Sequence, residues 1–314
     1  MKKTLVGYTG FVGSNLAASR KYDFVYNSQN IEESFAQTHE LVIYAGVRAE
    51  KFLANSNPAA DNLLIQNAIR NIERMRPKAL VLISTIDVYQ TPNAVTESDI
   101  PSKDGLHPYG LHRLELEDWV RSNVSEHHIV RLPGLFGRNL KKNFIYDMIH
   151  LVPYMMKAEL WESLAIESPL VSQSYVEAPN GFRKLAALSP ASFMKLREYF
   201  SKAKFNALRF TDSRSRYQFY DLAALDGHIQ LVLSKGFRLV NLCTEPVEVG
   251  ELHEHVFGSR FVNIGPASPV SYDMRTEYVD ALGGTGAYLA SKATIMNAIR
   301  RHVLCSIEEL KGGI

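Results

Sequence analysis

Short runs of apolar residues recur along the first half of the chain, and longer stretches with helical periodicity separate them. Continuous apolar runs of this length are typical of parallel strands that are buried on both faces of a sheet. Five runs that are rich in β-branched or aromatic residues are therefore predicted to be strands: Thr4–Tyr8, Asp23–Tyr26, Leu41–Ala45, Ala79–Ser84 and His128–Leu132.

The clearest helix is predicted over Pro58–Arg74, between the third and fourth of these runs. Asn57 can cap this helix, and Pro58 suits its first position because a proline has no N–H group to leave unpaired. Apolar residues recur at every fourth position of the segment, at Ala60, Leu64, Ala68 and Ile72. Strands and helices that alternate over this length predict an α/β fold, a doubly wound parallel sheet of the Rossmann type with helices on both faces.

The pattern changes after Gly137. Residues 139–205 have a mostly helical pattern that prolines interrupt, and strand-like runs return only later in the chain. These runs are Phe205–Phe210, Gln218–Tyr220 and Phe237–Leu242. We therefore expect a Rossmann domain that comprises residues 1–138 and 206–245. A smaller, mixed substrate-binding lobe is expected to comprise residues 139–205 and 246–314.

The composition excludes several classes of function. Of the 314 residues, 46% are hydrophobic and 22% charged, and the net charge of +2 lacks the basic excess with which nucleic-acid-binding proteins neutralise phosphates. No run approaches the roughly 18 apolar residues that span a membrane. Cys243 and Cys305 are far apart in the chain, and free thiols are typical of the reducing cytoplasm. We therefore expect a cytoplasmic protein that binds neither nucleic acid nor membranes.

A glycine-rich segment, Gly7-Tyr8-Thr9-Gly10-Phe11-Val12-Gly13, follows the first predicted strand and leads into a predicted helix. In a dinucleotide-binding loop one glycine makes the tight turn, a second lets the backbone approach the pyrophosphate, and a third lets helix and strand pack closely. The N-terminus of the helix then offers N–H groups to the phosphates. A plain turn would need only one of the three glycines, so the segment predicts a dinucleotide site. Its candidate contacts are Gly7, Gly10, Phe11, Val12 and Gly13, together with Asn27 and Ala45 at the ends of the next two strands.

The stretch about 20 residues after the first glycine distinguishes the two nicotinamide cofactors. In NAD-binding chains an acidic residue there hydrogen-bonds the adenosine ribose. This chain has Asn27-Ser28-Gln29-Asn30, which contains no carboxylate to repel the 2′-phosphate of NADP and no arginine to bind it. Both NAD and NADP are therefore candidate cofactors.

Thr85 and Tyr109 are candidates for proton-transfer chemistry. Thr85 follows the fourth predicted strand, and Tyr109 shares one face of a predicted helix with Arg113, four positions further on. A tyrosine hydroxyl has an ordinary pKa near 10, and a fixed cation beside it favours the phenolate. Tyr109 is thus a candidate general base for a sugar hydroxyl, with Thr85 positioning the same oxygen. The alternative is an amphipathic helix with an exposed contact between Tyr109 and Arg113.

Together with the glycine loop, the segments Ser84–Tyr89 and His107–Arg113 resemble the extended short-chain dehydrogenase/reductase family, which includes nucleotide-sugar epimerases and dehydratases. The resemblance covers nearly the whole chain and is strongest over residues 1–138. Further matches are Asn62, the strand end Arg131–Gly137, and Arg216 ahead of Tyr217–Leu222. The resemblance implies an NAD(P)-dependent epimerase or dehydratase that transfers hydride between nicotinamide and a nucleotide-linked sugar, with Thr85, Tyr109 and Arg113 in the catalytic site. A 4-keto sugar reductase is the nearest alternative.

Two positions depart from the family pattern. The family has lysine where this chain has Arg113. Arginine keeps the charge and can donate to the cofactor ribose, so Arg113 is also a candidate cofactor contact. It is never deprotonated, so it cannot replace lysine in a proton relay. Dehydratase-like members have acidic residues at the positions of both Ile86 and Asp87, so this chain has only one of the two acidic residues typical of dehydratases. Asp87 is either a second acid–base group or a local cap of the following loop. Arg113 also keeps open another class of function, a protein that binds NAD(P) without catalysis.

Candidate substrate contacts lie later in the chain. Asn143 lies in a polar loop, and the resemblance places Arg216 where related enzymes hold the diphosphate of a nucleotide sugar; a solvated basic loop is the alternative. His253 and His255 would point to different faces of a helix, so no metal site is expected.

The resemblance also implies a homodimer built by the helices that start near Pro58 and Tyr109. Their apolar faces include Leu64, Ala68, Ile72, Leu116 and Val120.

Overall fold

A computed structural model describes residues 2–178 and 181–312, and the contacts divide the chain into two compact units. The first unit comprises Met1–Leu140, Arg216–Val247 and Ser271–Ile295. The second unit comprises Lys141–Ser215, Glu248–Val270 and Met296–Ile314. These boundaries differ from the expected ones, because residues 206–215 group with the second unit and residues 139–140, 246–247 and 271–295 with the first.

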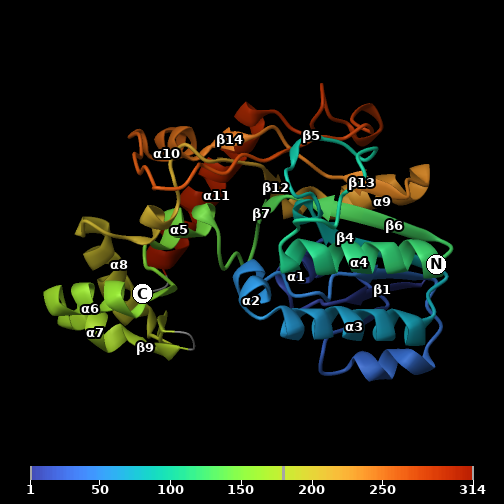
Figure 1. Ribbon diagram of the computed structural model, residues 1–314, viewed down its shortest axis with the longest axis horizontal. Coiled ribbons are helices and arrows are strands. Elements are labelled where there is room, and N and C mark those ends of the chain that lie inside the picture. The colour runs from blue at the N-terminus through green and yellow to red at the C-terminus, as the bar shows by residue number, and fades with distance from the viewer. Residues whose placement is uncertain (1, 179–180, 313–314) are drawn as a thin grey trace. The chain divides into compact units, whose positions relative to one another are not determined.

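The first unit is built on a six-stranded sheet in which all neighbours are parallel, which confirms the predicted doubly wound α/β fold (Figure 1). In spatial order the strands are β13 (Leu239–Asn241), β6 (His127–Leu132), β4 (Ala79–Thr85), β3 (Leu41–Tyr44), β1 (Lys3–Val6) and β2 (Phe24–Tyr26). The order reverses between β1 and β3. In open parallel sheets, ligands bind beyond the carboxyl ends of the strands at such a reversal.

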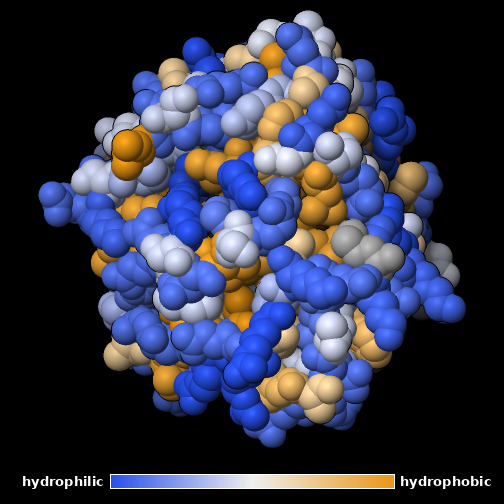
Figure 2. Space-filling view, turned by 90° about the vertical axis from the view of Figure 1, so that its right-hand side faces the viewer, coloured by the Kyte–Doolittle hydropathy of each residue, from blue (hydrophilic) through white to orange (hydrophobic). Residues whose placement is uncertain are grey.

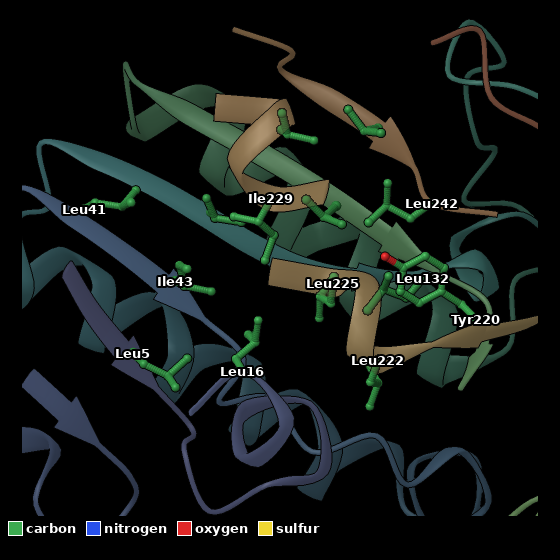
Figure 3. Close-up of a cluster of buried hydrophobic side chains, with 14 of the residues drawn as sticks. Leu5, Leu16, Leu41, Ile43, Leu132, Tyr220, Leu222, Leu225, Ile229 and Leu242 are labelled. Carbon is green, nitrogen blue, oxygen red and sulfur yellow. The ribbon is translucent and has the colours of Figure 1, made fainter. Parts of the chain in front are cut away.

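Except for the edge strand β2, each strand of this sheet contributes to two hydrophobic clusters, one on each face, because successive side chains point to opposite faces. Leu5 lies in one cluster and Val6 in the other, and Ile43 and Tyr44 divide in the same way. The helices α1 (Phe11–Ser19) and α9 (Leu225–Lys235) supply the cluster of Leu5 and Ile43, while α3 (Pro58–Met75) and α4 (Pro108–Asn123) supply the other. Figure 3 shows the first cluster, with Leu5 and Ile43 of the sheet and Ile229 of α9.

The helix α3 begins at Pro58 as predicted, and the Asn57 side chain accepts a hydrogen bond from the Ala60 N–H group. Its buried apolar face differs in part from the predicted one. Ala68 and Ile72 are buried, whereas Leu64 is 37% exposed and the adjacent Leu63 is 59% exposed. The faces expected to form a homodimer interface are therefore largely used by the core, which also contains Leu116 and Val120 of α4.

Shorter elements complete the first unit around this sheet. Two parallel pairs of strands lie outside it, β7 (Gly134–Phe136) with β12 (Phe219–Asp221) and β5 (Asn93–Val95) with β15 (Asp273–Met274). The remaining elements are η1 (Ile31–Ala36), α2 (Lys51–Ser56), η2 (Ile86–Val88), η4 (Leu222–Ala224), η5 (Asp280–Leu282) and β11 (Arg216–Tyr217), with β14 (Val247–Glu248) at the boundary.

The second unit has its own core, in which Val171, Leu196 and Phe200 are fully buried. It is mostly helical, as predicted, but also contains an antiparallel sheet in the order β8-β10-β9. Its strands are β8 (Met155–Lys157), β9 (Tyr175–Ala178) and β10 (Phe182–Leu185), and its helices are α5 (Phe144–His150), α6 (Ala158–Glu167), α7 (Pro169–Ser174), α8 (Pro190–Lys202) and α10 (Val249–Phe257). The last helix, α11 (Lys292–Gly312), begins in the first unit and ends in the second.

The predicted strand Phe205–Phe210 is wrong. Its residues form a short 3-10 helix, η3 (Ala207–Phe210), because the Asn206 side chain accepts a hydrogen bond from the Leu208 N–H group and caps a turn.

Hydrophilic residues predominate on the face shown in Figure 2, with apolar ones interspersed. Within the described part of the chain, none of the helices is both long and apolar enough to cross a membrane.

Candidate active site

The glycine loop connects β1 to α1, and two of its glycines are required by close backbone contacts. Gly7 has a φ of +89°, and a Cβ atom there would lie 2.5 Å from the carbonyl oxygen of Ala45. A Cβ atom on Gly13 would lie 2.1 Å from the carbonyl oxygen of Gly7. Only glycine is compatible with these distances, so the two residues let the first turn of α1 pack directly on the loop.

The N-terminus of α1 lies in this loop and is open to a ligand. Gly10 is the capping residue, and it has no side chain with which to bind the first turn. The N–H groups of Phe11 and Val12 therefore have no partner inside the helix, and the helix dipole favours an anion beside them. A pyrophosphate fits this arrangement, because its oxygens would accept from the N–H groups.

Asn27 and Ala45 follow β2 and β3, on either side of the loop in the strand order. The Ala45 N–H group donates to the Val6 carbonyl at 2.9 Å, which holds the backbone against β1. The Asn27 side-chain oxygen accepts from the Gln29 N–H group at 2.8 Å and stabilises a turn. The structure thus places both residues at the carboxyl edge of the sheet, next to the glycine loop.

Tyr109 and Thr85 are brought together by a third close contact. Thr85 ends β4, η2 follows at once, and Tyr109 lies in the first turn of α4. A Cβ atom on Gly110 would lie 2.0 Å from the carbonyl oxygen of Asp87, so glycine at this position lets α4 pack directly on η2. This contact brings Tyr109 close enough to Thr85 for that residue to lower its pKa, although 23 residues separate them in the chain.

Tyr109 is 6% exposed. Burial raises the pKa of its hydroxyl above the ordinary value, and the Asp87 carboxylate adds to that rise. The cation of Arg113, the Thr85 hydrogen bond and the charge of Lys51 oppose it by stabilising the phenolate. Two cations, Arg113 and Lys51, therefore act on Tyr109, whereas the sequence indicated only Arg113.

Arg113 stacks on Tyr109, with its guanidinium carbon 3.9 Å from the centre of the ring. Its terminal nitrogens bind within the protein. One donates to the Asp61 carboxylate and to the Tyr109 carbonyl, and the other donates to the Arg48 carbonyl at 2.6 Å. The Arg113 side chain is only 5% exposed, so it is a buried, fixed cation.

Asp87 lies beside this tyrosine and is paired with Lys51. The Lys51 Nζ atom lies 2.6 Å from the Asp87 Oδ1 atom, and His107 approaches the same oxygen at 3.7 Å. Burial alone would raise the pKa of Asp87, but the nearby His107 ring and the charge and hydrogen bond of Lys51 hold it below the ordinary value. Asp87 is therefore an ionised carboxylate in the site, although its backbone N–H group also binds the Thr85 hydroxyl in a local turn.

Lys51 was not identified from the sequence. It lies in the short helix α2, between the third and fourth strands of the chain, in a stretch without a periodic pattern. No spacing rule links it to Tyr109. Lys51 could have been suspected only from its position after a predicted parallel strand, since the loops after neighbouring strands meet at one edge of the sheet.

The candidate substrate residues fall in different units. Asn143, in the second unit, has a φ of +94° and caps α5, because its side-chain oxygen accepts from the N–H groups of Ile145 and Tyr146. Arg216 begins β11 in the first unit and is exposed. The nearby Arg214 is paired with Asp212 at 2.7 Å.

His253 and His255 lie on the predicted helix, which is α10. The His253 Nδ1 atom contacts the Ser259 carbonyl and the His255 Nε2 atom contacts the Asn297 side chain, so each ring has a separate partner. Among residues 2–178 and 181–312, no group of three or more histidine, cysteine or acidic side chains is arranged to hold a metal ion.

Comparisons with known structures agree with this fold. A dTDP-4-dehydrorhamnose reductase from Yersinia enterocolitica has a TM-score of 0.64 at 13% identity, covering 98% of this chain and 100% of that one. The protein RMD from Pseudomonas aeruginosa, solved with NADPH, has a TM-score of 0.63 at 16% identity, covering 98% and 100%. A UDP-N-acetylglucosamine 4-epimerase from Bacillus cereus has a TM-score of 0.57 at 15% identity, covering 96% and 95%.

At these identities the likeness shows a shared fold. Among curated proteins, none matches the chain in sequence. The family model of the RmlD substrate binding domain, however, matches residues 3–161, just over half of the chain. This match confirms the resemblance to extended short-chain dehydrogenases/reductases that the motifs predicted. The chain belongs to the RmlD substrate binding domain family.

Proposed function

We propose that this protein is an NAD(P)H-dependent reductase of a keto group on a nucleotide-linked sugar. The observation that carries the proposal is the buried Tyr109, whose pKa Thr85 and Arg113 lower, at the same sheet edge as the glycine loop. The named relatives support it, since one is a dTDP-4-dehydrorhamnose reductase and another was solved with NADPH.

The glycine loop would hold the cofactor. Its pyrophosphate would rest on Gly7, Gly10 and Gly13 and accept from the first N–H groups of α1, with Asn27 and Ala45 beside the nucleotide. When bound, the nicotinamide supplies the hydride. Asn27 brings no carboxylate against a 2′-phosphate, so the loop suits NAD and NADP alike.

Tyr109 acts as the acid of the reduction. It donates its hydroxyl proton to the carbonyl oxygen of the sugar as the hydride reaches the adjoining carbon, and Thr85 hydrogen-bonds the same oxygen. The Arg113 cation above the ring stabilises the phenolate that remains. Arg216 would bind the diphosphate through two parallel hydrogen bonds.

A nucleotide-sugar epimerase is the second candidate. Asp87 favours it, because an ionised carboxylate beside Tyr109 could move a proton at a neighbouring carbon. A dehydratase fits less well, since Ile86 provides no second acidic group.

A panel of 4-keto and UDP-linked sugars tests the proposal. With NADPH or NADH, the protein should oxidise the cofactor, seen as falling absorbance at 340 nm, with at least one keto sugar. Epimerised product without net cofactor oxidation would favour the second candidate. Tight cofactor binding with no turnover of any sugar would contradict both and leave a protein that binds NAD(P) without catalysis.

A further inference from the structure

We propose that Lys51 supplies the proton that restores Tyr109 after each turnover, through a hydrogen-bonded chain that runs by way of Thr85 and Asp87. The inference deepens the proposed function and rests on it, because Tyr109 must first give up its proton to a substrate. It assigns to Lys51 the part that Arg113, at the position of the family's lysine, is chemically unable to play.

The contacts run from Tyr109 to Lys51. The Thr85 hydroxyl interacts with that of Tyr109 and stabilises its phenolate, and it lies 3.4 Å from the Asp87 Oδ2 atom. The other carboxylate oxygen, Oδ1, accepts from the Lys51 Nζ atom at 2.6 Å. Asp87 thus bridges Thr85 and Lys51 with its two oxygens.

Lys51 and Arg113 differ in the properties that a proton donor needs. The Arg113 guanidinium is permanently charged, 5% exposed, and bound to Asp61 and to the Arg48 carbonyl. The Lys51 side chain is 40% exposed, so its amine can recover a proton from water. An ammonium can also be deprotonated, which a guanidinium in a protein cannot.

Contacts with α4, the helix that contains Tyr109, fix the position of Lys51. The Tyr109 N–H group donates to the Asn55 side chain at 3.0 Å, and Asn55 lies in the same helix, α2, as Lys51. Arg113 donates to the Arg48 carbonyl at 2.6 Å, just before that helix. Two contacts from α4 therefore fix the segment on both sides of Lys51.

The proton transfers balance. The substrate oxygen takes the Tyr109 proton, the phenolate takes one from Thr85, Thr85 takes one from Asp87, and Asp87 takes one from Lys51. Lys51 then recovers a proton from solvent, so each residue returns to its starting state and one proton from water ends on the product hydroxyl. Because the ordinary pKa values of tyrosine and lysine are close, about 10 and about 10.4, the overall transfer is nearly balanced in free energy.

His107 and Tyr272 also lie near the Asp87–Lys51 pair, so the experiment must distinguish them from Lys51 as the proton donor. His107 approaches Asp87 Oδ1 at 3.7 Å, and its Nδ1 atom accepts from the Gly110 N–H group, so the proton lies on Nε2. Tyr272 lies 3.2 Å from the Lys51 Nζ atom. If His107 rather than Lys51 supplied the proton, His107→Asn would lower turnover and Lys51→Met would not, and that result would overturn the proposal.

The pairing of Lys51 with Asp87 is tested first without turnover. Competitive acetylation across a pH series, read by peptide mass spectrometry, reports the reactivity of each lysine in the folded protein. In Asp87→Asn, Lys51 should become reactive at lower pH, with at least about a tenfold gain at pH 8, because its counter-ion is lost. Lys103, paired with Asp118 on the surface, should react as in the parent. An unchanged Lys51 would overturn the proposal.

The transfer itself is tested on the sugar that the panel identifies. Lys51→Ala should lose about a hundredfold in kcat with little change in KM, and methylammonium should restore part of it whereas tetramethylammonium should not. Lys51→Arg should stay impaired, because arginine keeps the charge but does not release a proton. Lys103→Met is the matched control and should equal the parent. Full activity of Lys51→Arg, or rescue by tetramethylammonium, would overturn the relay, whereas a parent inert with every sugar would instead refute the proposed function.

Discussion

At the scale of single residues, Gly13 places the strictest demand on the cofactor loop. A Cβ atom at this position would lie 2.1 Å from the Gly7 carbonyl oxygen, so Gly13→Ala must displace the loop from the first turn of α1. We expect this variant to lose at least about tenfold in NAD(P)H affinity, measured by fluorescence titration, because the N–H groups no longer converge on one anion.

The matched control is Gly227→Ala in α9, where nothing lies within 4 Å of an added Cβ atom. It should bind the cofactor as the parent does. A folded Gly13→Ala protein with the parent's affinity would show that the pyrophosphate does not bind at this loop.

Arg113 is a structural cation as well as a neighbour of Tyr109. Arg113→Met would leave the buried Asp61 carboxylate with only His112 as a close partner, and such a loss typically costs about 3–5 kcal/mol of unfolding free energy. Denaturant unfolding should show this cost, and Asp61→Asn in the same chain should recover part of it. Arg238→Met, which removes a half-exposed surface pair, should cost less than about 1 kcal/mol. Equal stability of the Arg113 and Arg238 variants would contradict the account of the buried pair.

The sequence motifs identified the residues of the site that act through local geometry. Thr85 and Tyr109 follow from a strand end and a helix start, and both elements form as predicted. Lys51 and Asn55 were missed because their contacts with Asp87 and Tyr109 join loops far apart in the chain. No periodicity or spacing encodes such a contact.

At the scale of elements, the apolar runs of the first unit predicted its strands because the strands inside the sheet are buried on both faces. The small sheet of the second unit was not predicted. Its strands are three or four residues long and expose some of their apolar side chains, with Val176 52% exposed, so they lack the continuous apolar run of a buried strand.

Helix α5 contains a carboxyl group that makes stability depend on pH. Burial raises the pKa of Asp147 to about 7 in the folded protein, against about 3.9 in the unfolded chain. Between these values the unfolded chain loses a proton that the folded protein keeps, so stability should fall as the pH rises from 4 to 7. Asp147→Asn removes this loss and should raise stability by about 1–4 kcal/mol at pH 8 but little at pH 4.

Thermal unfolding at the two pH values measures the effect. The control is Asp104→Asn, at an exposed position, which should change stability equally at pH 4 and pH 8. A stabilisation by Asp147→Asn that is as large at pH 4 as at pH 8 would contradict a raised pKa at this site.

At the scale of the whole molecule, we predict a homodimer through α3. Most of the apolar face that suggested it lies in the core, and the apolar side chains left exposed are those of Leu63 and Leu64, 59% and 37% exposed. The double substitution Leu63→Glu and Leu64→Glu should convert the dimer into a monomer, because charges are costly in an apolar interface. Light scattering at micromolar concentration measures the change. Ile166→Glu, at an 86% exposed position of α6, is the control. A monomeric parent would refute the prediction.

The central claim is that Tyr109 donates a proton during reduction of a nucleotide-linked sugar. Its most direct test is the turnover of Tyr109→Phe, which removes only the hydroxyl, measured by cofactor oxidation at 340 nm on the sugar that the parent reduces. We predict NAD(P)H affinity within about twofold of the parent and a kcat lower by about 10² to 10⁴, the usual contribution of general acid catalysis. A kcat within a few-fold of the parent would contradict the account and assign the proton to another residue.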